Sequence, residues 1–207
     1  MTQVLAANDE YVVEAVAEII ASGQLAVIPT DTVYGIAARL TDDAILRLYL
    51  AKERTPDKAI PILIATIEDL DLVAQPLSPY AHRLADAFWP GPLTLVLPKR
   101  DGLPQQVSQL PTIGVRIPDN NLTRAIIQSA GGALAITSAN VSGHPPAQTA
   151  QEVIDQLGES VSIVVDGGTC ENDVASTVAT IEGRTIRIVR EGPITQLELQ
   201  NVIDSYI

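Results

Sequence analysis

Residues 25–35 of the chain, Leu25-Ala26-Val27-Ile28-Pro29-Thr30-Asp31-Thr32-Val33-Tyr34-Gly35, join a short apolar run to a dense polar cluster. The apolar part is typical of a strand buried on both faces. We expect a helix before it that begins at Asp9, with Asn8 as its cap, and stops at Gly23. Ligands of open α/β sheets bind where strands end, so the polar part is a candidate site. An ordinary turn, with Asp31 and the threonines bonding the backbone, explains the same residues.

Strand and helix patterns alternate outward from this stretch. Further strands are expected over residues 61–65, 93–97, 113–117, 134–137, 163–165, 176–181 and 185–189. Helices are expected over residues 42–52 and 79–89, and after the capping pairs Thr149/Glu152 and Thr195/Glu198. Short links join the last three strands, which predicts a partly antiparallel or mixed sheet. The pattern indicates an α/β domain of about seven to eight strands and six or seven helices.

The charge balance restricts the function. The 207 residues include 13 basic and 25 acidic side chains, a net charge of −12, with 46% hydrophobic residues. This composition is globular and excludes a generic electrostatic binder of nucleic acid, which needs a basic surface. Aromatic residues make up 3% of the chain, which argues against a stacking platform for single strands. A local basic pocket for a small anion remains compatible with these numbers.

Cysteine, histidine and targeting signals add further limits. The single Cys170 excludes an internal disulfide and a cysteine-based zinc site. His82 and His144 are the two histidines, which makes a histidine-rich metal site improbable. No signal peptide or membrane-spanning pattern stands out, so the expected location is cytoplasmic.

Three cations gather in a second polar cluster, Lys52-Glu53-Arg54-Thr55-Pro56-Asp57-Lys58. The planar fork of Arg54 and the point charges of Lys52 and Lys58 suit the oxygens of a polyphosphate. The alternative is a solvated helix end, where cations favour the negative end of the helix dipole.

Two more clusters follow apolar strand patterns. Arg116 lies inside Ile113-Gly114-Val115-Arg116-Ile117, where it needs a carboxylate or a ligand, because an unpaired buried charge is costly. A structural ion pair explains it as well as a ligand contact does. The fourth cluster, Thr137-Ser138-Ala139-Asn140-Val141-Ser142-Gly143, offers hydroxyls, an amide and a glycine that could hold an anion, although many turns look similar.

Together these clusters resemble the YrdC/TsaC family, the threonylcarbamoyl-AMP synthases, over residues 8–193. The matching words are Pro29-Thr30-Asp31-Thr32-Val33-Tyr34-Gly35, Lys52-Glu53-Arg54, Trp89-Pro90-Gly91-Pro92-Leu93-Thr94, Val115-Arg116-Ile117-Pro118, Ser138-Ala139-Asn140-Val141-Ser142-Gly143 and Ser176-Thr177. Each is weak alone, whereas their joint order and spacing are specific. The resemblance implies a single YrdC-like domain over residues 8–193, in which a twisted mixed sheet with flanking helices surrounds a deep concave pocket. Residues 194–207 would form a C-terminal helix packed on the same domain.

The resemblance also implies an activity. The family makes L-threonylcarbamoyladenylate from L-threonine, bicarbonate and ATP with Mg²⁺, and releases pyrophosphate. A downstream tRNA threonylcarbamoyl transferase then modifies the adenosine beside the anticodon. Two alternatives stay open: a non-enzymatic protein that binds double-stranded RNA or assists ribosome assembly, and carbamoyl-adenylate chemistry without threonine. The charge of −12 argues against the first, and against tight nucleic-acid binding by this chain.

By resemblance, individual residues receive roles in this reaction. Lys52 and Arg54 are the expected catalytic residues, and no side chain is expected to be a dedicated ligand of the metal. The expected ATP contacts are Arg54, Lys58, Thr112, Asn140, Thr149 and Arg190. The expected threonine contacts are Thr32, Arg116, Ser138 and Ser176. The chain departs from the family pattern in the segment Thr55-Pro56-Asp57-Lys58-Ala59-Ile60-Pro61 and at Leu63, where some relatives carry a histidine.

Overall fold

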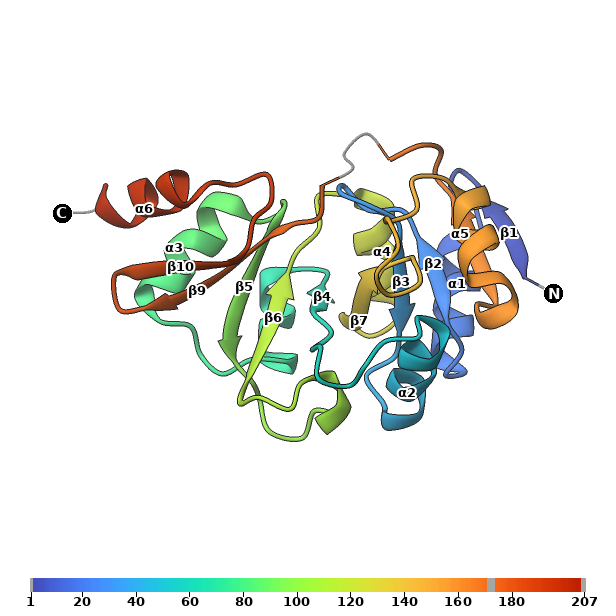
Figure 1. Ribbon diagram of the computed structural model, residues 1–207, viewed down its shortest axis with the longest axis horizontal. Coiled ribbons are helices and arrows are strands. Elements are labelled where there is room, and N and C mark those ends of the chain that lie inside the picture. The colour runs from blue at the N-terminus through green and yellow to red at the C-terminus, as the bar shows by residue number, and fades with distance from the viewer. Residues whose placement is uncertain (1, 171–173, 206–207) are drawn as a thin grey trace.

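The structure is a computed structural model that describes residues 2–170 and 174–205. Within these residues, ten strands form one sheet in the order β1-β8-β2-β3-β7-β4-β6-β5-β9-β10 (Figure 1). Their bounds are β1 Gln3–Ala6, β2 Ala26–Ile28, β3 Gly35–Ala38, β4 Ile62–Ile64, β5 Leu93–Pro98, β6 Thr112–Arg116, β7 Ala133–Ser138, β8 Ile163–Asp166, β9 Thr177–Glu182 and β10 Thr185–Arg190. Parallel and antiparallel pairs occur together, so the sheet is mixed, as the short links between strands predict.

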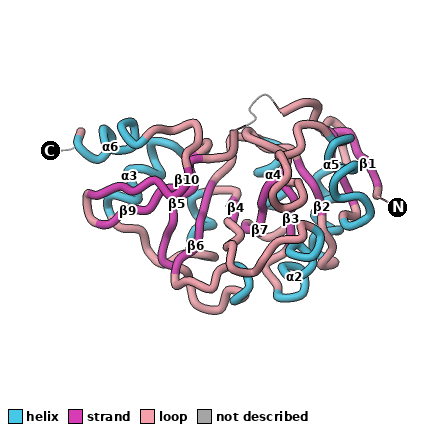
Figure 2. Tube along the Cα trace, in the orientation of Figure 1, coloured by secondary structure: helices cyan, strands magenta, loops and turns pink. Residues whose placement is uncertain are grey.

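In the part of the chain that the structure describes, six α-helices flank the sheet, and Figure 2 shows most of them toward the two ends of the molecule. They are α1 Val12–Ala21, α2 Asp42–Ala51, α3 Pro79–Phe88, α4 Asn121–Ser129, α5 Ala150–Leu157 and α6 Gln196–Asp204. Short 3₁₀ helices span Ile67–Leu72, Gln105–Val107 and Gly158–Ser160. No helix within residues 2–170 and 174–205 is both long enough and apolar enough to cross a bilayer.

The core has two layers because strand side chains alternate between the faces of the sheet. Ala26 and Ile28 of β2 pack with α1 and α4 in one layer. Val27, between them, joins the larger layer on the other face, which includes residues of α2, α3, α5 and α6. The helix α6 contacts α3 and β10, while the division of the chain at residue 193 remains a prediction.

Three expectations need correction. The described residues form ten strands, two more than the upper count expected, because β1 and β3 carry weak strand patterns. The sequence of β3 is Gly-Ile-Ala-Ala, and its backbone pairs with β2 and β7 on its two sides. Helix α1 begins at Val12 rather than Asp9, after turns over residues 7–11. The Thr195/Glu198 box forms in full, whereas Glu152 accepts from the Gln148 N–H instead of completing a box with Thr149.

Candidate functional site

A cavity of about 480 Å³ opens on the side of the sheet that carries the first polar cluster. Its wall combines the loop after β2 with side chains from β4, β5, β6, β7, β9 and β10, so it assembles segments that lie far apart in the sequence. Among the predicted site residues, those that line it are Thr32, Arg54, Thr112, Arg116, Ser138, Ser176 and Arg190. Seven of the eleven predicted residues therefore meet at one cavity.

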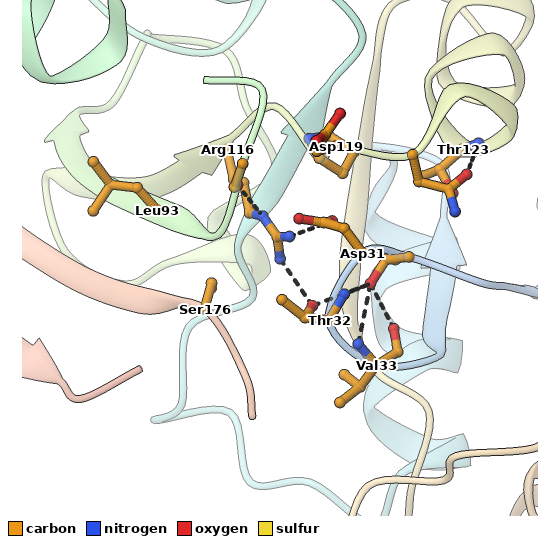
Figure 3. A network of polar contacts seen from close by, with 12 residues as sticks. Asp31, Thr32, Val33, Leu93, Arg116, Asp119, Thr123 and Ser176 are labelled. Atoms are coloured by element: carbon orange, nitrogen blue, oxygen red, sulfur yellow. Dashed lines mark hydrogen bonds and ion pairs between the residues drawn. The ribbon is translucent and has the colours of Figure 1, made fainter. Parts of the chain in front are cut away.

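Arg116 forms the centre of a polar network at one end of the cavity. Figure 3 shows its guanidinium pointing from β6 toward Asp31 and Thr32 on the loop after β2. It forms an ion pair with Asp31 and donates to Thr32 Oγ1 at 3.1 Å and to the Gly91 carbonyl at 2.9 Å. An arginine side chain has five N–H groups, and these contacts use one each on Nε, Nη1 and Nη2. One N–H on each terminal nitrogen therefore remains for a ligand. Arg116 is thus both a structural ion pair and a fork suited to a carboxylate.

Thr30 shapes the loop that meets this arginine. Its hydroxyl donates to the Val33 carbonyl at 2.6 Å and accepts from the Thr32 and Val33 N–H groups at 3.1 and 3.2 Å. Such a side-chain turn needs a short hydroxyl residue directly after the strand. The segment is therefore the ordinary turn that its residues predict, and this turn places Thr32 at the cavity wall, whereas its functional role stays a prediction.

Ser176 and Arg190 form a second polar group across the cavity. The Ser176 hydroxyl lies 2.8 Å from Thr94 Oγ1, and Arg190 donates to the Ser176 carbonyl at 2.7 Å and to its hydroxyl at 3.1 Å. Strand β10 carries one extra residue here. Ile188 pairs with Ala179 and Arg190 pairs with Val178, so Val189 is the extra residue between the two pairs. This bulge lets two consecutive side chains, Val189 and Arg190, line the same cavity.

Arg54 approaches from the loop after α2. Its Nε donates to the Lys58 carbonyl at 3.1 Å and its Nη2 to the Ala59 carbonyl at 2.9 Å, so the guanidinium holds this loop in shape. The Lys58 side chain itself is exposed and lies outside the cavity wall. Its predicted contact with ATP therefore stays a prediction.

The charges of two cavity arginines act on a third, Arg190. Burial lowers the pKa of Arg190, and the charges of Arg116 and Arg54 lower it further. Burial is also the main cause that lowers the pKa of Arg54 and of Arg116. Of these three arginines, Arg116 forms an ion pair with a carboxylate, whereas the contacts of Arg54 and Arg190 given above are to neutral oxygens. An anion beside Arg190 would offset the effect of the two neighbouring positive charges on its pKa.

Lys52 and Asn140 lie behind the cavity rather than on its wall. Lys52 is 1% exposed and its ammonium donates to the carbonyl oxygens of Ser138 and Asn140. Asn140 donates from its amide to the carbonyls of Val141 and His144, both at 2.8 Å. Neither side chain lines the cavity, so their predicted ligand contacts are untested by this geometry. Thr149 caps α5 by accepting from the Glu152 N–H at 3.2 Å and also lies outside the cavity wall.

Sequence reasoning assigned no role to several residues of the wall. Thr94 lines the cavity and contacts the Ser176 hydroxyl, whereas the sequence marks Thr94 only as part of a motif shared with the family. Thr180 and Val178 face the cavity together with Ser176, which a period of two along β9 would have indicated. Leu110 is 62% exposed at the wall, and nothing in its local pattern suggests a site.

Tyr34 closes the loop after β8 onto the loop after β2. Its hydroxyl accepts from the Gly167 N–H at 3.0 Å and donates to the Gly168 carbonyl at 2.6 Å. Burial is the main cause that raises its pKa to about 12. A Cβ on Gly167 would lie 2.8 Å from carbons of the Pro29 ring, so this contact requires glycine.

Comparison with known proteins is consistent with this geometry. Residues 18–192 match the family Sua5_yciO_yrdC, described as "Telomere recombination". The threonylcarbamoyl-AMP synthase of Pyrococcus abyssi is 34% identical over 197 residues, which cover 94% of this chain and 58% of that protein. The threonylcarbamoyl-AMP synthase of Bacillus subtilis is 35% identical over 206 residues, which cover 98% of this chain and 59% of that protein.

Solved structures agree with the sequence matches. The crystal structure of P. abyssi Sua5 complexed with L-threonine superposes with a TM-score of 0.92 at 33% identity and covers 99% of this chain. The match extends over 61% of that structure's chain, so this sequence spans about three fifths of the length of the relatives above.

Proposed function

The chain belongs to the Sua5/YciO/YrdC family, and from that premise we propose that it makes L-threonylcarbamoyladenylate from L-threonine, bicarbonate and ATP, with release of pyrophosphate. The observation that carries the proposal is the convergence of Arg54, Arg116 and Arg190 on one cavity in a chain of net charge −12. Three guanidiniums at one cavity suit a ligand with several negative groups, such as a nucleoside triphosphate beside a carboxylate.

The proposed threonine end of the cavity lies at Arg116. Its two remaining N–H groups would bind the threonine carboxylate as a fork, while Asp31 fixes the plane of the guanidinium. Thr32 and Ser176 would border the rest of the amino acid, because Thr32 contacts Arg116 and Ser176 lines the same cavity opposite this network. Ser138 lines the cavity at the end of β7 and would contribute its hydroxyl. A threonine-bound relative with the same fold supports this assignment.

Arg54 and Arg190 would bind the phosphates of ATP. Both carry positive charge at the cavity wall, and the charge of Arg54 contributes to lowering the pKa of Arg190, which supports a shared anionic ligand. Thr112 lines the wall on β6 and would contact the nucleotide. Lys58 lies on the loop that Arg54 holds and would act on the polyphosphate as a point charge from the rim.

The proposed reaction needs positioning and charge stabilisation more than proton transfer. The neutral amine of threonine attacks carbon dioxide derived from bicarbonate, a carbon–nitrogen bond forms, and a proton leaves to solvent. A carbamate oxygen then attacks the α-phosphorus of ATP, and the bond from this phosphorus to the bridging oxygen of pyrophosphate breaks. The guanidiniums stabilise the charge that develops on the phosphate oxygens. Enclosure in the cavity would protect the unstable carbamate from water.

We propose that Mg²⁺ enters with ATP, since magnesium commonly binds through substrate phosphates together with water. Within the described residues no three side chains of His, Cys, Asp or Glu gather as a metal site. The metal would neutralise phosphate charge, and the arginines would orient the same phosphates. A downstream tRNA threonylcarbamoyl transferase in the cytoplasm would consume the adenylate.

The test is pyrophosphate release by the purified chain with ATP and Mg²⁺, leaving out threonine and bicarbonate in turn. Release should require both, and the adenylate should be detected by mass spectrometry. Arg190→Met should lose most of the activity. Arg184→Met is the matched control on the same hairpin, because Arg184 forms an exposed ion pair with Asp204 outside the cavity. Equal release without threonine would overturn the proposal and favour carbamoyl-adenylate chemistry.

A further inference from the structure

Two hydroxyl groups meet in the wall of the cavity, one from β5 and one from the residue just before β9. Thr94 Oγ1 lies 2.8 Å from Ser176 Oγ, and the two residues are 3% and 5% exposed. The register brings them together, because Thr94 pairs with Val178, which follows Ser176 by two residues and lines the same cavity. Ser176 borders the amino acid in the proposed function, whereas Thr94 has no assigned part in it.

The Thr94 side chain is held in one orientation by its methyl group. A Cβ on Gly114 of β6 would lie 3.0 Å from Thr94 Cγ2 and 3.5 Å from Pro61 Cβ, so the methyl occupies the space that the missing side chain leaves. Threonine branches at Cβ, and therefore a fixed methyl also fixes the position of the hydroxyl oxygen. The Thr94 oxygen is thus held beside Ser176, and it leaves that place only if the methyl moves off Gly114.

The hydrogen bonds at Ser176 Oγ decide what its own proton can do. A guanidinium has no acceptor atom, so Arg190 Nη2 donates to Ser176 Oγ at 3.1 Å. Within residues 2–170 and 174–205, the Thr94 hydroxyl has no hydrogen-bond partner other than Ser176 Oγ. If Thr94 donates there, both lone pairs of Ser176 Oγ are occupied, and the Ser176 proton is left for an acceptor on a ligand.

We propose that Thr94 is a positioning residue of the amino-acid site, which donates to Ser176 Oγ and so directs the Ser176 proton to an oxygen of bound L-threonine. A hydroxyl that accepts from a guanidinium and from a second hydroxyl is polarised, which strengthens the hydrogen bond that it donates. Thr94 therefore acts through Ser176 and does not itself bind the amino acid. This inference rests on the proposed function in one respect, that L-threonine binds at Ser176.

Calorimetric titration of single and double variants with L-threonine tests the proposal. Thr94→Val keeps the branched shape and removes the hydroxyl, so the affinity should fall about twofold to tenfold, the range for one neutral hydrogen bond. Thr94→Ser restores the hydroxyl and should recover most of the lost affinity. In a Ser176→Ala background, Thr94→Val should cause no further loss, because the hydroxyl that Thr94 orients is already absent.

Thr177→Val is the matched control for lost stability. Thr177 follows Ser176, is fully buried outside the cavity wall, and exchanges hydrogen bonds of 2.8 and 2.9 Å with the Ile194 backbone. This variant should unfold at a lower urea concentration and keep the L-threonine affinity of the unmodified protein. Thr94→Val should also keep its MgATP affinity, because Arg190 retains the Ser176 carbonyl as its partner.

The outcomes separate this inference from the proposed function. The same loss from Thr94→Val with and without Ser176→Ala would show that Thr94 binds the ligand directly, which overturns the positioning role. Native affinity in Thr94→Val, or an equal loss in Thr177→Val, would overturn it as well. If Thr94→Val does not fold, Thr94→Ser and Thr94→Ala still differ by one oxygen, and equal affinities of these two contradict the inference. An unmodified protein that binds no L-threonine would count against the proposed function itself.

Discussion

Replacement of Arg116 by methionine should damage folding and ligand binding through two separable effects. The substitution removes the ion pair with Asp31 and the two hydrogen bonds to Thr32 Oγ1 and the Gly91 carbonyl. The side chains of Arg116 and Asp31 are only 5% and 13% exposed, so the carboxylate loses its cation where water solvates it poorly. Removing one partner of such a pair costs about 3–5 kcal/mol. A domain of ordinary stability, about 5–15 kcal/mol, would remain folded but with a lower urea midpoint.

A second substitution, Asp31→Asn, separates the two effects. In Arg116→Met/Asp31→Asn no buried carboxylate remains at this position, so the double variant should recover about 1–3 kcal/mol relative to Arg116→Met alone. Threonine binding should not recover, because the proposed fork for the carboxylate is absent. Loss of that charge-assisted contact costs about 1.5–3 kcal/mol, about a tenfold to hundredfold weaker affinity.

Urea unfolding followed by circular dichroism measures the stability of the three variants, and calorimetric titration with L-threonine measures the affinity. Asp31→Asn alone serves as the reference for the loss of the carboxylate. An Arg116→Met variant that loses less than about 1 kcal/mol would refute the buried-pair argument. Native threonine affinity in the double variant would refute the carboxylate role of Arg116.

Four further predictions follow from the same geometry. Arg54→Ala and Lys58→Ala should each weaken MgATP binding about tenfold to a hundredfold in calorimetry, with threonine binding less affected; unchanged ATP affinity in both would contradict the phosphate assignment. The isolated chain should show no saturable sub-micromolar binding of tRNA by fluorescence anisotropy at physiological salt, because acidic residues outnumber basic ones by 25 to 13. Gly167→Ala should lower the free energy of unfolding by about 1–3 kcal/mol, since its Cβ would lie 2.8 Å from the Pro29 ring, and an unchanged urea midpoint would show that the loop moves freely. The pKa of Tyr34 is raised from 10.0 to about 12, so the unfolded chain loses this proton first and stability should fall as pH rises from about 10 to 12; a Tyr34→Phe variant with the same slope would rule this out.

The apolar runs of the sequence were sufficient to predict most of the sheet. Strands such as β2 and β7 are buried on both faces, and burial of that kind leaves a continuous hydrophobic pattern. Strand β1 is largely exposed and β3 is made of small residues, so their pairing depends on neighbours that a local pattern does not contain. The helix starts at Ser78 and Thr195 were easier to predict than these two strands, because each capping hydrogen bond joins residues only three positions apart.

The candidate site was predictable at the level of residue type and less so at the level of orientation. Arg116 in an apolar strand needed a partner, and the structure supplies Asp31 while leaving N–H groups for a ligand. Lys52 and Arg54 are two positions apart, yet Arg54 lines the cavity and Lys52 turns behind it. That difference depends on how the end of α2 packs against the turn after β7, which lies 86 residues away at Ser138. Local sequence does not encode such a contact.

The bulge in β10 also affects which insertions and deletions the chain can accept. Arg190 pairs with Val178, and Val189 is the extra residue between two regular pairs. Deletion of Val189 would restore strict alternation after Ile188 and leave Arg190 opposite Val178, on the face that lines the cavity. Deletion of a residue from β9 would instead reverse the face of every side chain beyond that point. A variant that lacks Val189 should therefore keep the Arg190 side chain in the cavity.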